Sequence, residues 1–92
     1  MKYEIQKTSQ FKKDFKLALK RNCDIKKLQE IITLLANGET LPETCFDHPL
    51  KGDYGGYREC HVEPDWLLVY KITESVLILT LYRTGTHSDL FK

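Results

Sequence analysis

The sequence lacks the segments that would carry a protein into or across a membrane. Apolar runs such as Val76–Leu79 fall far short of the ~20 residues that a transmembrane helix requires. The opening residues, Met-Lys-Tyr-Glu-Ile, do not provide the charged start and apolar stretch of a secretory signal peptide. We therefore expect a cytoplasmic protein with no membrane partner.

Cysteine is scarce, and the common metal-binding spacings are missing. Cys23, Cys45 and Cys60 are odd in number and share no repeated spacing, which argues against a disulfide framework and fits a reducing compartment. No C-x-x-C or H-E-x-x-H pattern occurs. Cys60 and His61 are neighbours in an expected strand, so their side chains point to opposite faces and cannot readily bind one ion. We therefore expect no metal and no other cofactor.

Net charge is also small, at +1, but it is unevenly divided along the 92 residues. Residues 1–40 hold nine Lys and Arg against five Asp and Glu, a balance of +4, and residues 41–92 hold five against eight, a balance of −3. A lysine-rich helix face is either simply solvated or steers the protein toward a phosphate backbone or an acidic partner. Both interpretations stay open, and the candidate substrate-binding lysines are Lys12, Lys13 and Lys16.

The N-terminal half predicts one strand followed by two helices. Residues 2–7 alternate polar and apolar side chains, which is typical of a short strand. Thr8 or Ser9 can cap a first helix, and Asp24 a second. Asn37-Gly38 ends the second helix, because glycine readily adopts the left-handed conformation found after helices. The apolar stripes of these helices contain Phe11, Phe15, Ala18 and Leu19 in the first, and Ile25, Leu28, Ile32 and Leu35 in the second.

The C-terminal half predicts the sheet that these helices cover. Residues 43–56 read as a long irregular loop, and strands are expected at 57–62, 66–72 and 76–83, joined by short turns. Short turns make them antiparallel neighbours. We therefore predict a single domain, 1–92, of the α+β class: two N-terminal helices on one face of a mainly antiparallel four-stranded sheet, in the order β-α-α-β-β-β, with a short C-terminal helical turn.

Histidines and carboxylates gather in the second half. Tyr57, Glu59 and His61 share one face of their strand, because side chains alternate along it. If Cys60 faces the helices, this row lies on the uncovered side of the sheet, where an ordinary solvated face is the simpler explanation. Asp65, just past the next turn, can approach His61 and fix its tautomer.

The tail adds a histidine beside a helix-capping pattern. Thr86-His87-Ser88-Asp89 fits the capping box, so His87 would start a short helical turn whose free N–H groups can meet an anion. His48, in the glycine-rich loop, is the third histidine. Arg83, at the end of the last strand, is a candidate phosphate clamp.

Several acids, bases and cations without a metal motif suit RNA cleavage. RNA carries its own nucleophile, the 2′-hydroxyl, so the enzyme needs a base for that proton, a cation for the phosphate and an acid for the 5′-oxygen. Histidine can fill either proton-transfer role near neutral pH.

Three blocks of sequence resemble the YafQ branch of the RelE/ParE toxin superfamily: DHPLKG at 47–52, GYRECHVEPDWLLVYK at 56–71 and RTGTHSDLF at 83–91. The similarity covers essentially the whole chain. It implies a RelE-like fold and a toxin of a bacterial type II toxin–antitoxin system that cleaves mRNA on the ribosome without a metal. It also implies a cognate antitoxin of the DinJ kind, in a heterotetramer with the toxin.

The resemblance also implies site residues by position. His48, His61, Asp65 and His87 match the family's catalytic set, and Glu59 matches an acidic position beside it that is aspartate in a relative. Phe91 matches an aromatic that helps to hold the substrate. As a hypothesis, His87 is the general acid, His61 or Glu59 the general base, and Asp65 orients His61. His48 would assist proton transfer or stabilise transition-state charge, and Arg58 and Arg83 would contact phosphate.

Two other functional classes remain as alternatives. A toxin of the ParE type, which binds DNA gyrase without cutting nucleic acid, would share the fold, because fold alone does not decide function. A stand-alone binding or structural module is the third class. The three histidines favour RNA cleavage, since a gyrase-binding surface has no need of them.

Overall fold

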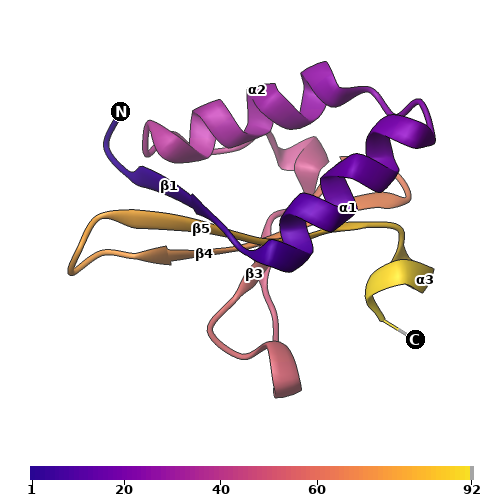
Figure 1. The fold of residues 1–92 in the computed structure, drawn as a ribbon. Coiled ribbons are helices and arrows are strands. Elements are labelled where there is room, and N and C mark those ends of the chain that lie inside the picture. The colour runs from indigo at the N-terminus through magenta and orange to yellow at the C-terminus, as the bar shows by residue number, and fades with distance from the viewer. Residues whose placement is uncertain (92) are drawn as a thin grey trace.

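The computed structural model describes residues 1–91, in which two helices cover one face of a five-stranded sheet (Figure 1). The strand order is β1-β5-β4-β3-β2, with β1 parallel to β5 and the other pairs antiparallel. The elements are β1 (Glu4–Lys7), α1 (Ser9–Lys20), α2 (Ile25–Ala36), η1 (Glu43–Cys45), β2 (His48–Pro49), η2 (Gly52–Tyr54), β3 (Arg58–Glu63), β4 (Trp66–Thr73), β5 (Ile78–Gly85) and α3 (His87–Leu90).

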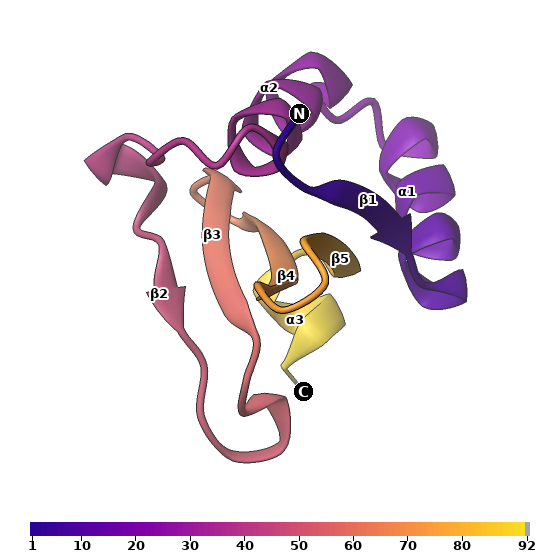
Figure 2. The same ribbon diagram turned by 90° about the vertical axis from the view of Figure 1, so that its left-hand side faces the viewer.

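The predicted α+β class and element order are confirmed, but the sheet has five strands and not four. The additional strand, β2, consists of His48 and Pro49 and pairs with Glu59 and Arg58 at one edge of the sheet (Figure 2). It lies inside the predicted irregular loop, which also holds two 3-10 turns, η1 and η2. Two residues are too few to show strand alternation, so the sequence pattern could not reveal this pairing.

The helix ends form as the capping residues predict. The Thr8 hydroxyl accepts a hydrogen bond from the Phe11 N–H at 3.0 Å, and the Asp24 carboxylate accepts one from the Lys27 N–H at 3.4 Å. Gly38 follows α2 with φ +76°, a left-handed conformation that glycine adopts without strain. The last strand begins at Ile78, later than expected, because Leu77 still lies in the turn with φ +53°.

The main core lies between the helices and the sheet. Trp66, Leu68 and Tyr70 point from β4 toward α1 and α2, where they meet Phe11 and Leu28. All five side chains are buried. No helix within residues 1–91 is long and apolar enough to span a membrane.

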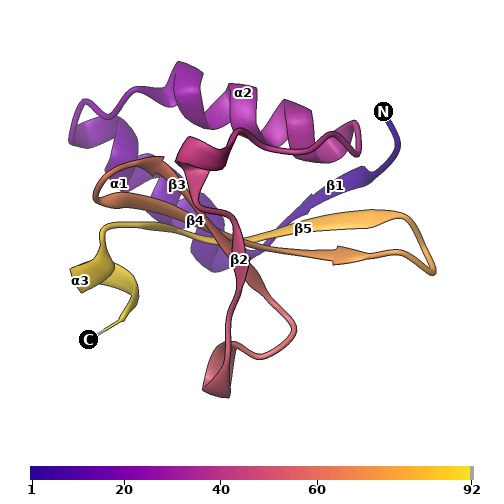
Figure 3. The same cartoon turned by 180° about the vertical axis from the view of Figure 1, so that it is seen from behind.

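The opposite face of the sheet is not bare, which corrects the expectation of an uncovered side. Leu67 and Val69 alternate with the core residues along β4 and pack with Leu90 of α3 in a second buried cluster. Figures 2 and 3 show α3 on the side of the sheet away from the two long helices. The partly buried side chains around this cluster are Leu50, Tyr54, Tyr57 and Tyr82. The C-terminal segment is therefore part of the packed structure.

A buried carboxylate on α1 holds the end of β5. Asp14 accepts hydrogen bonds from Arg83 Nε and Nη2, both at 3.1 Å, and from the Thr84 backbone N–H at 3.1 Å. Gln10 Nε2 donates a further bond at 3.0 Å. The bond to Asp14 is the main cause of a raised pKa for the Arg83 guanidinium. Asp14 thus fixes the point from which the chain leaves the sheet toward α3.

We expect Asp14→Ala to lower the free energy of unfolding by about 3 kcal/mol, because it leaves a half-buried guanidinium and a buried N–H without their acceptor. Urea denaturation measures the effect. Glu30→Ala, on the exposed face of α2, is the matched control and should change stability by less than ~0.5 kcal/mol. Equal, small effects of both variants would show that Asp14 does not anchor β5.

Candidate active site

The tail and the edge of the sheet bring histidines together on the face opposite the long helices. His61 lies near the end of β3, and His87 is the first residue of α3. The centroids of their rings are 5.6 Å apart. His48, on β2, pairs with Glu59 in the strand register, two residues before His61. The chain thus places all three histidines along one side of the molecule.

The His61 ring is oriented by a backbone carbonyl. Its Nδ1 lies 3.3 Å from the Pro64 oxygen, on the turn that joins β3 to β4. A carbonyl oxygen only accepts hydrogen bonds, so Nδ1 must carry the proton. In the neutral ring Nε2 then has a lone pair that can take a proton from a substrate.

The His87 ring is oriented by a carboxylate. Its Nδ1 lies 2.6 Å from Asp65 Oδ1, and the His87 backbone N–H donates to the same oxygen at 3.0 Å. These two bonds, the backbone one first, hold the pKa of Asp65 below its ordinary value. A carboxylate on Nδ1 stabilises a positive charge on the ring and leaves the Nε2–H free to be donated.

This contact corrects two expectations. Asp65 was expected to orient His61, and it binds His87, because the turn carries its side chain toward α3. The first N–H of α3 was expected to meet a substrate anion, and it donates to Asp65. The Asp65 carboxylate therefore occupies the anion position at the start of α3, which the sequence pattern assigns to a phosphate of the substrate.

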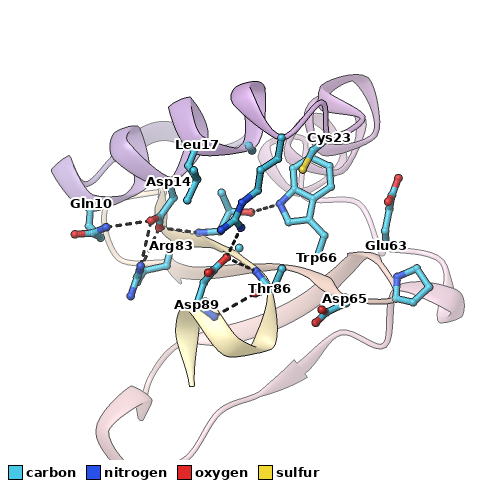
Figure 4. Close-up of a pocket in the computed structure, with 15 residues that line it drawn as sticks. Gln10, Asp14, Leu17, Cys23, Glu63, Asp65, Trp66, Arg83, Thr86 and Asp89 are labelled. Carbon is cyan, nitrogen blue, oxygen red and sulfur yellow. Dashed lines mark hydrogen bonds and ion pairs between the residues drawn. The ribbon is translucent and has the colours of Figure 1, made fainter. Parts of the chain in front are cut away.

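The predicted capping box is present, and an ion pair connects it to Arg21, the residue that follows α1. Thr86 Oγ1 accepts from the Asp89 N–H at 3.2 Å, and Asp89 Oδ2 accepts from the Thr86 N–H at 3.0 Å. Arg21 Nη1 lies 2.7 Å from the same Asp89 oxygen. The bond from Arg21, followed by that from Thr86, lowers the pKa of Asp89 to about 2. Figure 4 shows Thr86 and Asp89 facing α1 across a cavity of about 390 Å³.

Glu59 is buried and bound to His48. Its side-chain Oε2 lies 2.8 Å from His48 Nε2, and Glu59 as a whole is only 6% exposed. Within residues 1–91 its other oxygen, Oε1, has no hydrogen-bond partner. His48 Nδ1 lies 3.2 Å from the Pro49 oxygen, so both ring nitrogens face acceptors. These two contacts hold the His48 ring between Glu59 and the Pro49 carbonyl.

The predicted cationic residues are not gathered around the histidines. Arg83 is bound to Asp14, and Arg58 Nε lies 3.3 Å from Asp47. The lysines Lys12, Lys13 and Lys16 all lie on α1, and α1 and α3 lie on opposite sides of the sheet (Figure 1).

Aromatic side chains flank the histidines. Phe91 was predicted from the sequence, and its ring centroid lies 5.3 Å from that of Tyr54. Phe46 was not predicted, although it directly precedes the Asp47-His48 pair, and its ring centroid lies 5.7 Å from that of His61. An aromatic beside a histidine-bearing segment was the only sequence signal for it.

Within residues 1–91, no three His, Cys, Asp or Glu side chains are arranged to hold a metal ion. The arrangement instead offers two histidines with fixed Nδ1 atoms and unengaged Nε2 atoms. Such a pair can remove one proton and donate another across a single phosphate group.

The profile of a family described as "Bacterial toxin of type II toxin-antitoxin system, YafQ" matches residues 3–92. The chain is 49% identical over 89 residues to the mRNA interferase toxin YafQ of Escherichia coli K12, covering 96% of this chain and 95% of that protein.

Solved structures agree with the sequence comparison. The crystal structure of YafQ from E. coli BL21(DE3) has a TM-score of 0.92 at 47% identity, covering 98% of this chain and 99% of that one. The YafQ chain in the crystal structure of the E. coli DinJ–YafQ complex has a TM-score of 0.90 at 48% identity, with the same shares covered.

We expect Asp89→Asn to lower the free energy of unfolding at pH 7, because it removes the carboxylate charge that pairs with Arg21 and strengthens the bond from the Thr86 N–H. A carboxyl group with a lowered pKa stabilises the fold above its unfolded pKa and loses that contribution as the pH falls. The gap between wild type and variant should therefore shrink between about pH 4 and about pH 2. Urea denaturation across this range tests it, and a gap independent of pH would contradict it.

Proposed function

The chain belongs to the YafQ family of toxins of bacterial type II toxin–antitoxin systems, and from this premise we propose that it is an endoribonuclease that cleaves mRNA on the ribosome. The observation that carries the proposal is the pair formed by His61 and His87. Their rings are adjacent, each Nδ1 is bound to an acceptor, and each Nε2 is left for the substrate.

The two rings have different partners, and this difference supports a different role for each of them. His61 faces a neutral carbonyl, which leaves the uncharged ring ready to accept a proton. His87 faces the Asp65 carboxylate, which stabilises the charged ring that donates one. His61 is therefore the general base and His87 the general acid, with Asp65 orienting the acid.

The reaction then proceeds by transfer within the RNA. His61 Nε2 removes the proton of the 2′-hydroxyl, and the 2′-oxygen forms a bond to the neighbouring phosphorus. The bond from phosphorus to the 5′-oxygen breaks as His87 Nε2 gives that oxygen its proton. The products are a 2′,3′-cyclic phosphate and a 5′-hydroxyl, and no cofactor takes part.

Glu59 and His48 support this pair. Glu59 is too deeply buried to meet the substrate, so it is a positioning residue that holds the His48 ring through its Nε2. His48 assists proton transfer or stabilises charge in the transition state. This assignment takes Glu59 out of the choice of general base.

The remaining cationic residues do not take part in proton transfer. Lys12, Lys13 and Lys16 lie on α1, where they can contact ribosomal RNA while mRNA occupies the histidine face. Arg58, which is partly exposed, can contact phosphate, and Phe91 can stack on a base. Arg83 positions the tail through Asp14.

The natural inhibitor is an antitoxin of the DinJ kind. The E. coli relative was crystallised with DinJ, and this chain matches the YafQ chain of that complex over 98% of its length. We extend the assignment to a cytoplasmic heterotetramer of toxin and antitoxin.

We expect His61→Ala and His87→Ala each to slow single-turnover cleavage of ribosome-bound mRNA by ~10²–10⁴-fold, the usual contribution of a positioned acid or base. A scissile bond with sulfur in place of the 5′-oxygen separates the roles, because a thiolate leaves without a proton. That substrate should restore much of the rate of His87→Ala and little of that of His61→Ala. The opposite pattern would reverse the assignment.

We expect wild-type protein to cut mRNA on ribosomes well and naked RNA poorly, because the histidine face has few free cations to position RNA unaided. Mapping of 5′ ends with and without ribosomes measures this.

In a bacterium, His87→Ala should abolish both toxicity and mRNA cuts. A fully toxic His87→Ala that causes DNA damage would point to the gyrase-binding function instead.

A further inference from the structure

Phe46 is the exposed aromatic side chain closest to the proposed general base. We propose that its ring stacks on the base of the nucleotide immediately 5′ of the cut, the nucleotide that supplies the 2′-hydroxyl. This inference rests on the proposed function, and it adds a substrate-binding residue that contacts the RNA.

The position of the ring is the first argument. Phe46 is 67% exposed, and its centroid lies 5.7 Å from that of His61, with an interplanar angle of 73°. A large apolar ring left in water contributes little to the core, yet it gains stability when a flat base covers it. Every base has such a surface, so stacking suits an enzyme that meets many messages.

The backbone is the second argument. Phe46 has φ +48° and ψ +44°, a left-handed conformation that is uncommon for a bulky residue. Hydrogen bonds of Phe46 itself and of its neighbour Asp47 hold this segment in place. The Phe46 N–H donates to the Glu43 oxygen at 3.0 Å, and the neighbouring Asp47 carboxylate accepts from the Tyr70 hydroxyl at 2.6 Å. A strained conformation maintained by its surroundings is a frequent sign of a functional position.

The order of the rings gives the direction of the RNA. The centroids run from Phe46 to His61 at 5.7 Å and from His61 to His87 at 5.6 Å. His61 takes the proton of the nucleotide on the 5′ side of the cut, and His87 protonates the oxygen of the nucleotide on the 3′ side. Phe46 therefore lies beside the 5′ nucleotide. Phe91 lies in the same segment as His87, so it stacks on the nucleotide on the 3′ side of the cut.

The test compares single-turnover cleavage of ribosome-bound mRNA by variants at position 46. Phe46→Ala should lower the rate at subsaturating toxin by about tenfold, which corresponds to ~1.4 kcal/mol and lies within the range of base–aromatic stacking. Phe46→Trp should retain the rate, and Phe46→Leu, which is apolar without an aromatic face, should behave like Phe46→Ala. Val76→Ala, an exposed apolar residue in the β4–β5 turn, is the matched control and should cut like wild type.

An abasic ribonucleotide identifies the stacked base. Placed on the 5′ side of the cut, with its 2′-hydroxyl intact, it should slow the wild type about tenfold and leave Phe46→Ala unaffected. Placed on the 3′ side, it should slow wild type and Phe46→Ala by the same factor. Equal effects of the 5′ abasic site on wild type and variant would overturn the proposal.

Three other outcomes would also overturn it. Phe46→Ala could cut at the wild-type rate, or cut normally and bind the antitoxin more weakly, which would make Phe46 a protein contact. Phe46→Gly, which relieves the backbone strain, should unfold at a higher temperature and still cut slowly; wild-type cutting by this variant would contradict a role for the ring. If wild-type protein does not cut ribosome-bound mRNA, the proposed function itself fails.

Discussion

The Asp65 carboxylate is the contact on which the site depends. One of its oxygens accepts both the ring Nδ1–H and the backbone N–H of His87, and so joins the β3–β4 turn to the first residue of α3. The adjacent residue of the same turn, Pro64, orients His61 through its carbonyl. A single turn thus sets the tautomers of both histidines and the spacing between them. Asp14 on α1 and Arg21, which directly follows α1, hold the two ends of the segment that carries His87.

Because side chains alternate along each strand, the two faces of the sheet differ. One face packs against the helices, and the other carries the histidines and the C-terminal tail. Along β4, Trp66, Leu68 and Tyr70 build the core under the helices, while Leu67 and Val69 face the other way and seat the tail through Leu90. The tail therefore has its own apolar anchor, which a four-residue helix needs because so short a helix is not stable alone. Packed residues therefore lie directly beneath the segment that carries His87.

Much of this arrangement could be predicted from the sequence, and the failures share a cause. Caps, helices and the three-stranded meander follow from local periodicity and turn residues, as Thr8, Asp24 and Gly38 illustrate. The family blocks located His48, His61 and His87. Local patterns do not reveal partners that lie far apart in the chain. The sequence favours Asp65 beside His61 and Arg83 on phosphate, whereas the structure has Asp65 on His87 and Arg83 on Asp14. The sequence does not predict the strand at His48–Pro49, because this strand exists only through its pairing with β3.

The central claim is that His61 and His87 are both held with the proton on Nδ1 when neutral, each presenting Nε2 to the substrate. Two-bond ¹H–¹⁵N NMR spectra of protein labelled with ¹⁵N-histidine, recorded at a pH above the histidine titrations, report the tautomer of each ring directly. The account predicts a protonated Nδ1 and a bare Nε2 for both residues, with His61→Ala and His87→Ala assigning the signals. A neutral His61 or His87 with its proton on Nε2 would contradict it.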